Sequence, residues 1–311
     1  MDSTIVADGL SKSYSNVVAI KDISLKIDSG EIFGLIGPDG AGKTTIFRIL
    51  TTLSLADSGT ARVCGLDVVK DYQQIRSEIG YMPGHFALYQ DLSVEENLQF
   101  YATIFGTDVK SNYDNIKDIY CQLEPFRKRR AGALSGGMKQ KLALCCALVH
   151  RPKVLFLDEP TTGVDAVSRK EFWAMLGRIR QGGVTIFVST PYMDEAALCD
   201  RIAMISEGRI IGGGTPDQIR ASFPDRLYAA SGSDVFGMLK VLRTAEGVKD
   251  CNSFGSCCHV SVGQDGPQPE QIESFLKRAG FGDSIVVPVE PGIEDCFMRL
   301  TWSWLWKLKI V

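Results

Sequence analysis

Two short polar stretches, each directly after an apolar run, hold the side chains best suited to chemistry. The first is GPDGAGKT, Gly37 to Thr44, which follows a five-residue apolar run and precedes the helical pattern TIFRIL. Its spacing, G-x-x-x-x-G-K-[ST], is typical of a loop whose backbone amides curl around a phosphate at a helix N-terminus. Lys43 would reach the β and γ phosphates of a nucleotide, and the Thr44 hydroxyl would ligate Mg²⁺. The predicted nucleotide-binding residues of this loop are Gly37, Pro38, Asp39, Gly40, Ala41, Gly42, Lys43, Thr44 and Thr45.

The second stretch supplies two carboxylates. Asp158 and Glu159 end the apolar run VLFLDE, which begins at Val154. Asp158 would hold Mg²⁺ through water beside Thr44, and Glu159 would polarise an attacking water. Two carboxylates with separate roles favour a nucleotide hydrolase over a kinase.

Buried parallel strands must position these residues. Neither apolar run alternates with polar residues, which is the pattern of a strand buried on both faces of a parallel sheet. A third run, in VSTPYMDEA, stops at Thr190, turns at Pro191 and enters an acidic helical start. Strand, loop and helix in this order predict an α/β fold, with Pro191 at a strand end where catalytic side chains usually sit.

The amino-acid composition limits the kinds of partner that the chain can bind. The chain has 311 residues, of which 45% are hydrophobic and 23% charged, with a formal charge of −3. This balance gives no global attraction to nucleic acid, and no nucleic-acid partner is expected. The nine cysteines show no C-x-x-C spacing, so we expect reduced thiols and no metal-ligand cysteine. No secretory signal and no run of about 20 apolar residues is apparent, so another chain would have to cross any membrane.

The most specific pattern lies just before the second strand. LSGGM, Leu134 to Met138, is followed at a short interval by VLFLDE. The chain thereby resembles an ATP-binding cassette (ABC) ATPase, the motor domain of ABC transporters, in which LSGGQ precedes the carboxylate strand by about this interval. Ser135 can cap a helix whose Gly136 and Gly137 leave its N-terminus open as a second anion site. Two anion sites at opposite ends of a domain predict a head-to-tail dimer, in which Ser135, Gly136 and Gly137 contact the partner's ATP.

The resemblance covers most of residues 3–220 and implies further roles. Tyr14 matches the aromatic residue that stacks on adenine, the alternative being a plain surface tyrosine. Asp165 matches the loop that communicates across the dimer. LYQDLSVEENLQFYATIFG resembles the start of a helical subdomain, about residues 86–150, which in transporters docks the membrane partner. The implied fold is a P-loop NTPase (RecA-like) ABC core with a helical subdomain and an N-terminal antiparallel β part.

Two positions depart from the family pattern. Gly84 stands where a glutamine normally ends the strand after IGYMP and senses Mg²⁺ and the membrane partner. Pro191 stands where the family's switch histidine contacts the γ-phosphate. Proline offers neither a side-chain donor nor a backbone N–H. Since a positioned acid or base contributes about 10²–10⁴ in rate, we expect a site that binds ATP and turns over slowly, unless His85 moves into the vacant place.

The pattern of predicted helices and strands changes after Pro224. Residues 225–300 read as strand, helix, two short strands, helix and strand, which predicts a small α+β, ferredoxin-like domain after an ABC ATPase domain of residues 1–224. GIEDCFMRLT resembles the ending of export-type cassettes of the drug and polysaccharide branch, whose membrane partner is an ABC-2 permease. The hydrophobic tail, residues 301–311, has three alternating tryptophans and suits an interfacial anchor, an edge strand or the start of an interrupted following segment.

Three functions follow from these observations. The first is the ATP-binding subunit of an ABC exporter, a cytoplasmic ATPase on the inner face of the cell membrane that uses ATP and Mg²⁺. Its partners would be integral-membrane permease subunits and a second ABC ATPase domain, as a homodimer, a heterodimer or a tandem cassette. The second is an ATP-gated regulatory or dimerisation module with negligible hydrolysis. The third is a non-transport ABC ATPase, which the acidic composition disfavours.

Overall fold

The computed structural model describes residues 3–308, and side chains as far as residue 301. The chain divides into two compact units, Met1–Pro216 and Asp217–Val311. Each has its own hydrophobic core, and each is described by itself.

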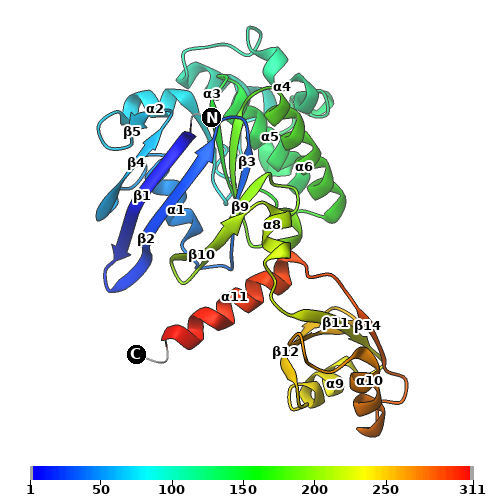
Figure 1. Ribbon diagram of the computed structural model, residues 1–311. Helices are drawn as coiled ribbons and strands as arrows, with labels where there is room; N and C mark the ends of the chain where they lie inside the picture. The colour runs from blue at the N-terminus through cyan, green and yellow to red at the C-terminus, as the bar shows by residue number, and fades with distance from the viewer. Residues whose placement is uncertain (1–2, 309–311) are drawn as a thin grey trace. The chain divides into compact units, whose positions relative to one another are not determined.

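A six-stranded sheet forms the centre of the first unit (Figure 1). Its order is β10-β9-β3-β8-β7-β6, and all neighbours are parallel except β9 and the edge strand β10, which pair antiparallel. The two predicted strands, β3 (Ile32–Ile36) and β7 (Val154–Asp158), are buried at every residue. The remaining strands are β6 (Ile79–Met82), β8 (Thr185–Thr190), β9 (Arg201–Ser206) and β10 (Arg209–Gly214).

Helix α1 (Lys43–Leu50) packs against the central sheet with one face and against a four-stranded antiparallel sheet with the other. The order of this antiparallel sheet is β2-β1-β4-β5, from the strands β1 (Ser3–Tyr14), β2 (Val17–Asp28), β4 (Ser58–Val63) and β5 (Leu66–Asp67). One core cluster joins this sheet to α1 and to the central sheet, as Ile5, Phe47 and Phe156 illustrate. The predicted N-terminal antiparallel part is therefore confirmed, and α1 lies between two layers that hold it from both sides.

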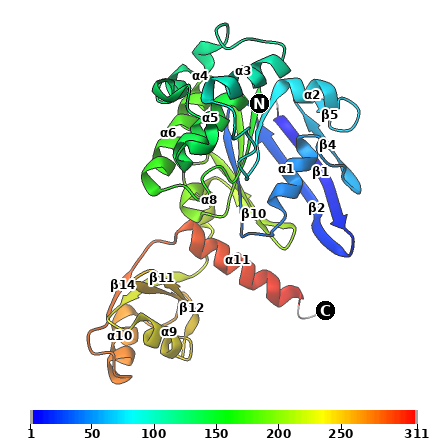
Figure 2. The same ribbon diagram turned by 180° about the vertical axis from the view of Figure 1, so that it is seen from behind.

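The predicted helical subdomain lies across the unit from this antiparallel sheet, where Figures 1 and 2 show α3, α4 and α5 together. Helix α3 begins with a capping box, in which Ser93 and Glu96 each accept from the other's backbone N–H. The helices of this unit after α1 are α2 (Tyr72–Glu78), α3 (Val94–Ile104), α4 (Tyr113–Tyr120), α5 (Gly136–Leu148), α6 (Ala166–Gln181) and α7 (Met193–Ala196), with 3₁₀ turns at Glu124–Phe126 and Ala131–Ala133.

The second unit begins within helix α8 (Pro216–Ala221), and the elements after this helix have the predicted order. Its antiparallel sheet runs β12-β13-β11-β14, with both helices on one face (Figure 1). This is the split βαβ, ferredoxin-like arrangement. The elements are β11 (Arg226–Ser231), α9 (Val235–Leu242), β12 (Val248–Phe254), β13 (Cys257–Val262), α10 (Pro269–Arg278) and β14 (Ile285–Pro288).

The expectation of an edge strand in the tail was wrong. The backbone from Ile293 to Leu308 forms one helix, α11, so the residues after Thr301 continue a helix. Alternation of tryptophans had suggested a strand period, but a helix with two acidic residues in its first turn is already under way at Glu294 and Asp295. The anchor interpretation concerns side chains outside the described residues.

Candidate nucleotide site

The phosphate-binding loop is packed so closely that two of its glycines accept no side chain. A Cβ on Gly37 would lie 2.2 Å from the Ile205 carbonyl oxygen, and one on Gly42 would lie 2.5 Å from the Ala19 carbonyl oxygen. Gly42 also has a φ of +103°, which favours glycine. The loop between β3 and α1 is thus held against β9 and β2, and its glycines have a packing reason besides any ligand.

Lys43 points into this loop. Its side chain is only 3% exposed, and its ammonium donates to the carbonyl oxygens of Gly37 at 2.8 Å and Pro38 at 3.0 Å. It also lies 3.0 Å from Glu159 Oε1. Asp39 points outward, since its side chain is 87% exposed. The structure therefore brings the predicted lysine and the predicted catalytic carboxylate together at the carboxyl ends of β3 and β7.

The two carboxylates differ in their surroundings. Asp158 is 2% exposed and accepts a hydrogen bond from Ser189 Oγ at 2.6 Å. Glu159 has a φ of +50°, a strained backbone conformation for a residue with a side chain, and its N–H donates to Ser189 Oγ and the Ser189 carbonyl oxygen. Thr162 Oγ1 donates to Glu159 Oε2 at 3.4 Å. Asp158 is thus oriented from one side while Glu159 stays accessible.

Sequence reasoning missed Ser189. Its hydroxyl contacts both carboxylate residues of the site, because it donates to Asp158 and accepts from the Glu159 N–H. Ser189 lies two residues before Pro191 in the same stretch. The signal was present, because parallel pairing of β7 with β8 places Ser189 opposite Asp158. Finding it required the register of the two strands.

Both departing positions border the site. The Gly37 N–H donates to the Thr190 carbonyl oxygen at 3.3 Å, which holds the turn at Pro191 beside the phosphate loop. A Cβ on Gly84 would lie 3.0 Å from the Asp158 carbonyl oxygen. Neither residue brings a side-chain donor or acceptor to this place.

The signature residues lie in a second cluster with Asp165. Ser135 caps α5 by accepting from the Met138 N–H at 3.4 Å, as expected. A Cβ on Gly137 would lie 2.7 Å from Ser168 Oγ, so the start of α5 packs against the start of α6. Asp165 caps α6 by accepting from two backbone N–H groups, and these bonds, above all that from Ser168, lower the pKa of the Asp165 carboxyl.

The remaining predicted residues lie at the margins. Thr44 and Thr45 are half-buried in the first turn of α1. Tyr14 is 43% exposed at the end of β1, with the Lys12 ammonium 5.7 Å from its ring centroid. An exposed ring at a hairpin end is free to stack on another planar group.

An apolar groove of about 350 Å³ opens next to β6. His85 and Phe86 line it from the loop after β6, Tyr101 and Phe105 from the region of α3, and His150 from the end of α5. Within residues 3–308, no helix is both long enough and apolar enough to cross a bilayer.

Comparison with known proteins places this geometry in a family. The family model described as ABC transporter matches residues 20–162. The probable multidrug ABC transporter ATP-binding protein YbhF of Escherichia coli is 39% identical over 222 residues, which are 71% of this chain and 38% of that protein's length. The daunorubicin resistance ATP-binding protein DrrA3 of Streptomyces coeruleorubidus is 32% identical, covering 96% of each chain.

A solved structure has the same fold. CbiO1 from Clostridium perfringens, described as part of the ABC transporter complex cbiONQ, superposes with a TM-score of 0.64 at 27% identity, over 71% of this chain and 92% of its own. The matched region holds the phosphate loop, the signature and both carboxylates. On this combined basis, the chain belongs to the ATP-binding proteins of the ABC transporter family.

Proposed function

We propose that the chain is the ATP-binding subunit of an ABC exporter, which binds ATP and hydrolyses it slowly to drive transport through a separate membrane permease. The observation that carries this proposal is the meeting of Lys43, Asp158 and Glu159 at one sheet edge, beside a turn where Pro191 offers no donor. The relatives named for multidrug transport and daunorubicin resistance support export.

Mg²⁺ would be held by Thr44 and Asp158. Both offer oxygen atoms, the ligands that Mg²⁺ prefers, and Ser189 orients the buried Asp158 carboxylate through one oxygen. When bound, the ion would neutralise charge on the phosphates. Lys43 would keep its loop carbonyls and exchange Glu159 for phosphate oxygens, and Glu159 would then be free to orient water.

The permease would dock in the groove beside β6. The groove's aromatic lining suits the apolar face of an amphipathic helix from a membrane subunit, which we propose to be of the ABC-2 type. Through this contact the chain would sit on the inner face of the cell membrane.

A second ABC domain would complete the machine. The Ser135, Gly136 and Gly137 cluster lies with Asp165, whereas the Lys43 cluster lies at the carboxyl ends of β3 and β7. This separation supports a head-to-tail dimer in which the signature serves the partner's nucleotide. Because Pro191 and Gly84 weaken this chain's own site, we propose an unequal pair whose other site turns over faster.

A second candidate function also rests on Pro191 and Gly84. If the missing donors abolish hydrolysis, the chain would be an ATP-gated dimerisation module rather than a working ATPase.

The deciding experiment measures ATP binding and steady-state hydrolysis of the full chain and three variants. We expect tight binding that Lys43→Ala abolishes, and slow turnover that Pro191→His raises at least about tenfold, since a positioned acid or base contributes about 10²–10⁴. Pro191→Ala is the matched control, because it removes the ring and restores the backbone N–H, as histidine does, without adding a side-chain donor.

Each outcome separates the alternatives. Brisk turnover by the unmodified chain contradicts a slow site. Tight binding with background turnover in the unmodified chain and in Pro191→His favours the dimerisation module. An equal gain in Pro191→Ala would mean that the proline ring or the absent backbone N–H, and not the missing side-chain donor, limits the rate.

A further inference from the structure

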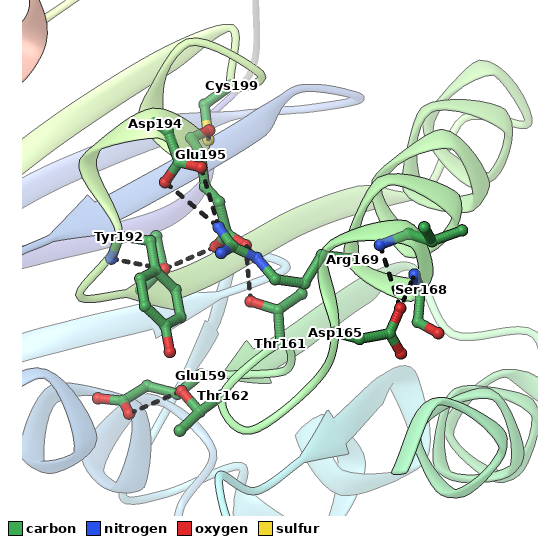
Figure 3. Close-up of polar contacts among 12 residues, drawn as sticks. Glu159, Thr161, Thr162, Asp165, Ser168, Arg169, Tyr192, Asp194, Glu195 and Cys199 are labelled. Atoms are coloured by element: carbon green, nitrogen blue, oxygen red, sulfur yellow. Dashed lines mark hydrogen bonds and ion pairs between the residues drawn. The ribbon is translucent and has the colours of Figure 1, made fainter. Parts of the chain in front are cut away.

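Glu195, in the short helix α7, is a buried carboxylate with three donors around it. It is 2% exposed. Thr161 Oγ1 donates to it at 2.7 Å, Thr190 Oγ1 at 2.6 Å and Arg169 Nε at 3.1 Å (Figure 3). A carboxylate removed from water must be satisfied in this way, so its position fixes the positions of its donors.

The donors come from the two segments that frame the nucleotide site. Thr161 lies between Glu159 and Asp165, in the loop that leaves β7. Thr190 is the last residue of β8, directly before Pro191. Arg169 lies one turn into α6, whose N-cap is Asp165. One carboxylate therefore ties the loop of Glu159 and Asp165 to the turn at Pro191.

The turn at Pro191 is held entirely by its neighbours. The Tyr192 N–H donates to Thr190 Oγ1 at 3.0 Å, and the Thr190 carbonyl oxygen accepts from Gly37. The Arg169 guanidinium lies 4.3 Å from the Tyr192 ring centroid and pairs with Asp194 at 3.0 Å. None of these contacts uses a backbone N–H of residue 191, so proline is accommodated without loss of the turn.

We propose that Glu195 is a positioning residue, which makes the Thr161 to Arg169 segment and the Thr190 to Tyr192 turn open and close as one unit. This inference deepens the proposed function, because the first segment holds the partner-facing loop and the second borders the phosphate loop. Lys43 and the phosphate loop make no direct contact with Glu195 in the bonds that define this cluster. Losing the carboxylate should therefore spare ATP affinity and slow turnover.

Hydrogen exchange of the nucleotide-free full chain tests the coupling without needing activity. In Glu195→Gln, the amide group keeps the size but cannot accept from all three donors. We expect amide exchange at least tenfold faster in residues 161–169 and in residues 190–196, which are the turn at Pro191 together with helix α7. Faster exchange in only one of them, or in neither, overturns the proposal.

Asp200→Asn is the matched control for this exchange. Asp200 pairs with Arg180 of the same helix α6 at 2.7 Å, but it also accepts from Ile32 at the amino end of β3, away from the site. We expect exchange in both segments to stay within twofold. Equal acceleration in this control would mean that any lost ion pair on α6 loosens them, which also overturns the proposal.

Kinetics in the Pro191→His background test the positioning role. Thr161→Val removes a donor without changing size, and Thr161→Ser keeps it. We expect Thr161→Val to lower kcat at least fivefold with KM for ATP within twofold, and Thr161→Ser to retain kcat. A rise in KM instead of a fall in kcat, or no rescue by serine, contradicts positioning. If Pro191→His neither binds nor hydrolyses ATP, the proposed function fails. The exchange result still decides whether Glu195 couples the two segments.

Discussion

The Lys43 ammonium lies 3.0 Å from the Glu159 carboxylate. The first is proposed to bind phosphate and the second to orient water. The ammonium already uses the Gly37 and Pro38 carbonyl oxygens, so phosphate oxygens would compete with a carboxylate for its remaining donor. Nucleotide binding and release of Glu159 would thus be one event. The Glu159 carboxylate would therefore stay paired with Lys43 until ATP binds.

His150 makes stability depend on pH. Its ring stacks on Phe105 with centroids 3.6 Å apart, and Nε2 lies 2.9 Å from the Ile79 carbonyl oxygen. Nε2 therefore donates, which leaves Nδ1 buried without a partner. Burial lowers the pKa of His150 below its ordinary 6.5, because a proton on Nδ1 would bring an unpaired charge into an apolar place.

The sign of the effect follows from this lowered pKa. Below about pH 6.5 the unfolded chain binds a proton that the folded chain refuses, so the free energy of unfolding falls as the pH drops from 7.5 to 5.5. Denaturant titrations at several pH values measure this fall. His150→Gln should flatten it, since an amide keeps the donor to Ile79, whereas His85→Gln, at an exposed imidazole, should not. An unchanged slope in His150→Gln would contradict the assignment.

At the scale of elements, the contact of α5 with α6 joins the signature to the Asp165 loop, which we propose faces the partner. Gly137 faces Ser168 so closely that an added methyl group would lie 2.7 Å from the serine oxygen and 3.0 Å from its Cβ. A shift of α6 toward α5 would therefore press on the start of α5.

Gly137→Ala should strain this contact. We expect the free energy of unfolding to fall by about 1–3 kcal/mol, the usual cost of overpacking, and the melting temperature to fall with it. Gly177→Ala on α6 is the control, because nothing lies within 4 Å of its added Cβ and alanine favours a helix by up to about 1 kcal/mol. The double variant Gly137→Ala, Ser168→Gly should recover most of the loss, and failure to do so would contradict a clash with Ser168.

At the scale of the whole molecule, the two units have separate cores and separate polar supports. In the second unit, the buried Asp225 accepts from Lys249 at 2.6 Å and Ser261 at 3.3 Å, and Arg299 of α11 lies 3.1 Å away. His259 Nδ1 lies 2.8 Å from Asp295. Helix α11 is thus attached to this unit by polar and charged side chains.

Asp225→Asn should weaken the second unit alone. Hydrogen bonds to a charged group contribute about 1.5–3 kcal/mol, and we expect a loss of roughly 2 kcal/mol, because Lys249 and Arg299 are partly exposed. Hydrogen exchange should quicken in β11, β13 and α11, while ATP affinity stays within twofold. Loss of ATP binding would show that the first unit depends on the second.

Local patterns were enough for much of the molecule. The phosphate loop, the two carboxylates and the element order of the second unit were predicted because glycine spacing, apolar runs and turn residues act over a few neighbours. Of the alternatives left open for the tail, the edge strand was wrong, since a short run of alternating aromatics does not outweigh a helix that began at Ile293.

The sequence by itself predicted which residues would bind a nucleotide, and it determined that Pro191 and Gly84 cannot contribute side-chain donors. Only the tertiary structure decided that Ser189 orients Asp158 and that Glu195 joins the two framing segments. The physical reason is separation: these partners lie 31 and 34 residues apart along the chain, and sheet register together with burial, which no local pattern encodes, brings them within hydrogen-bonding distance.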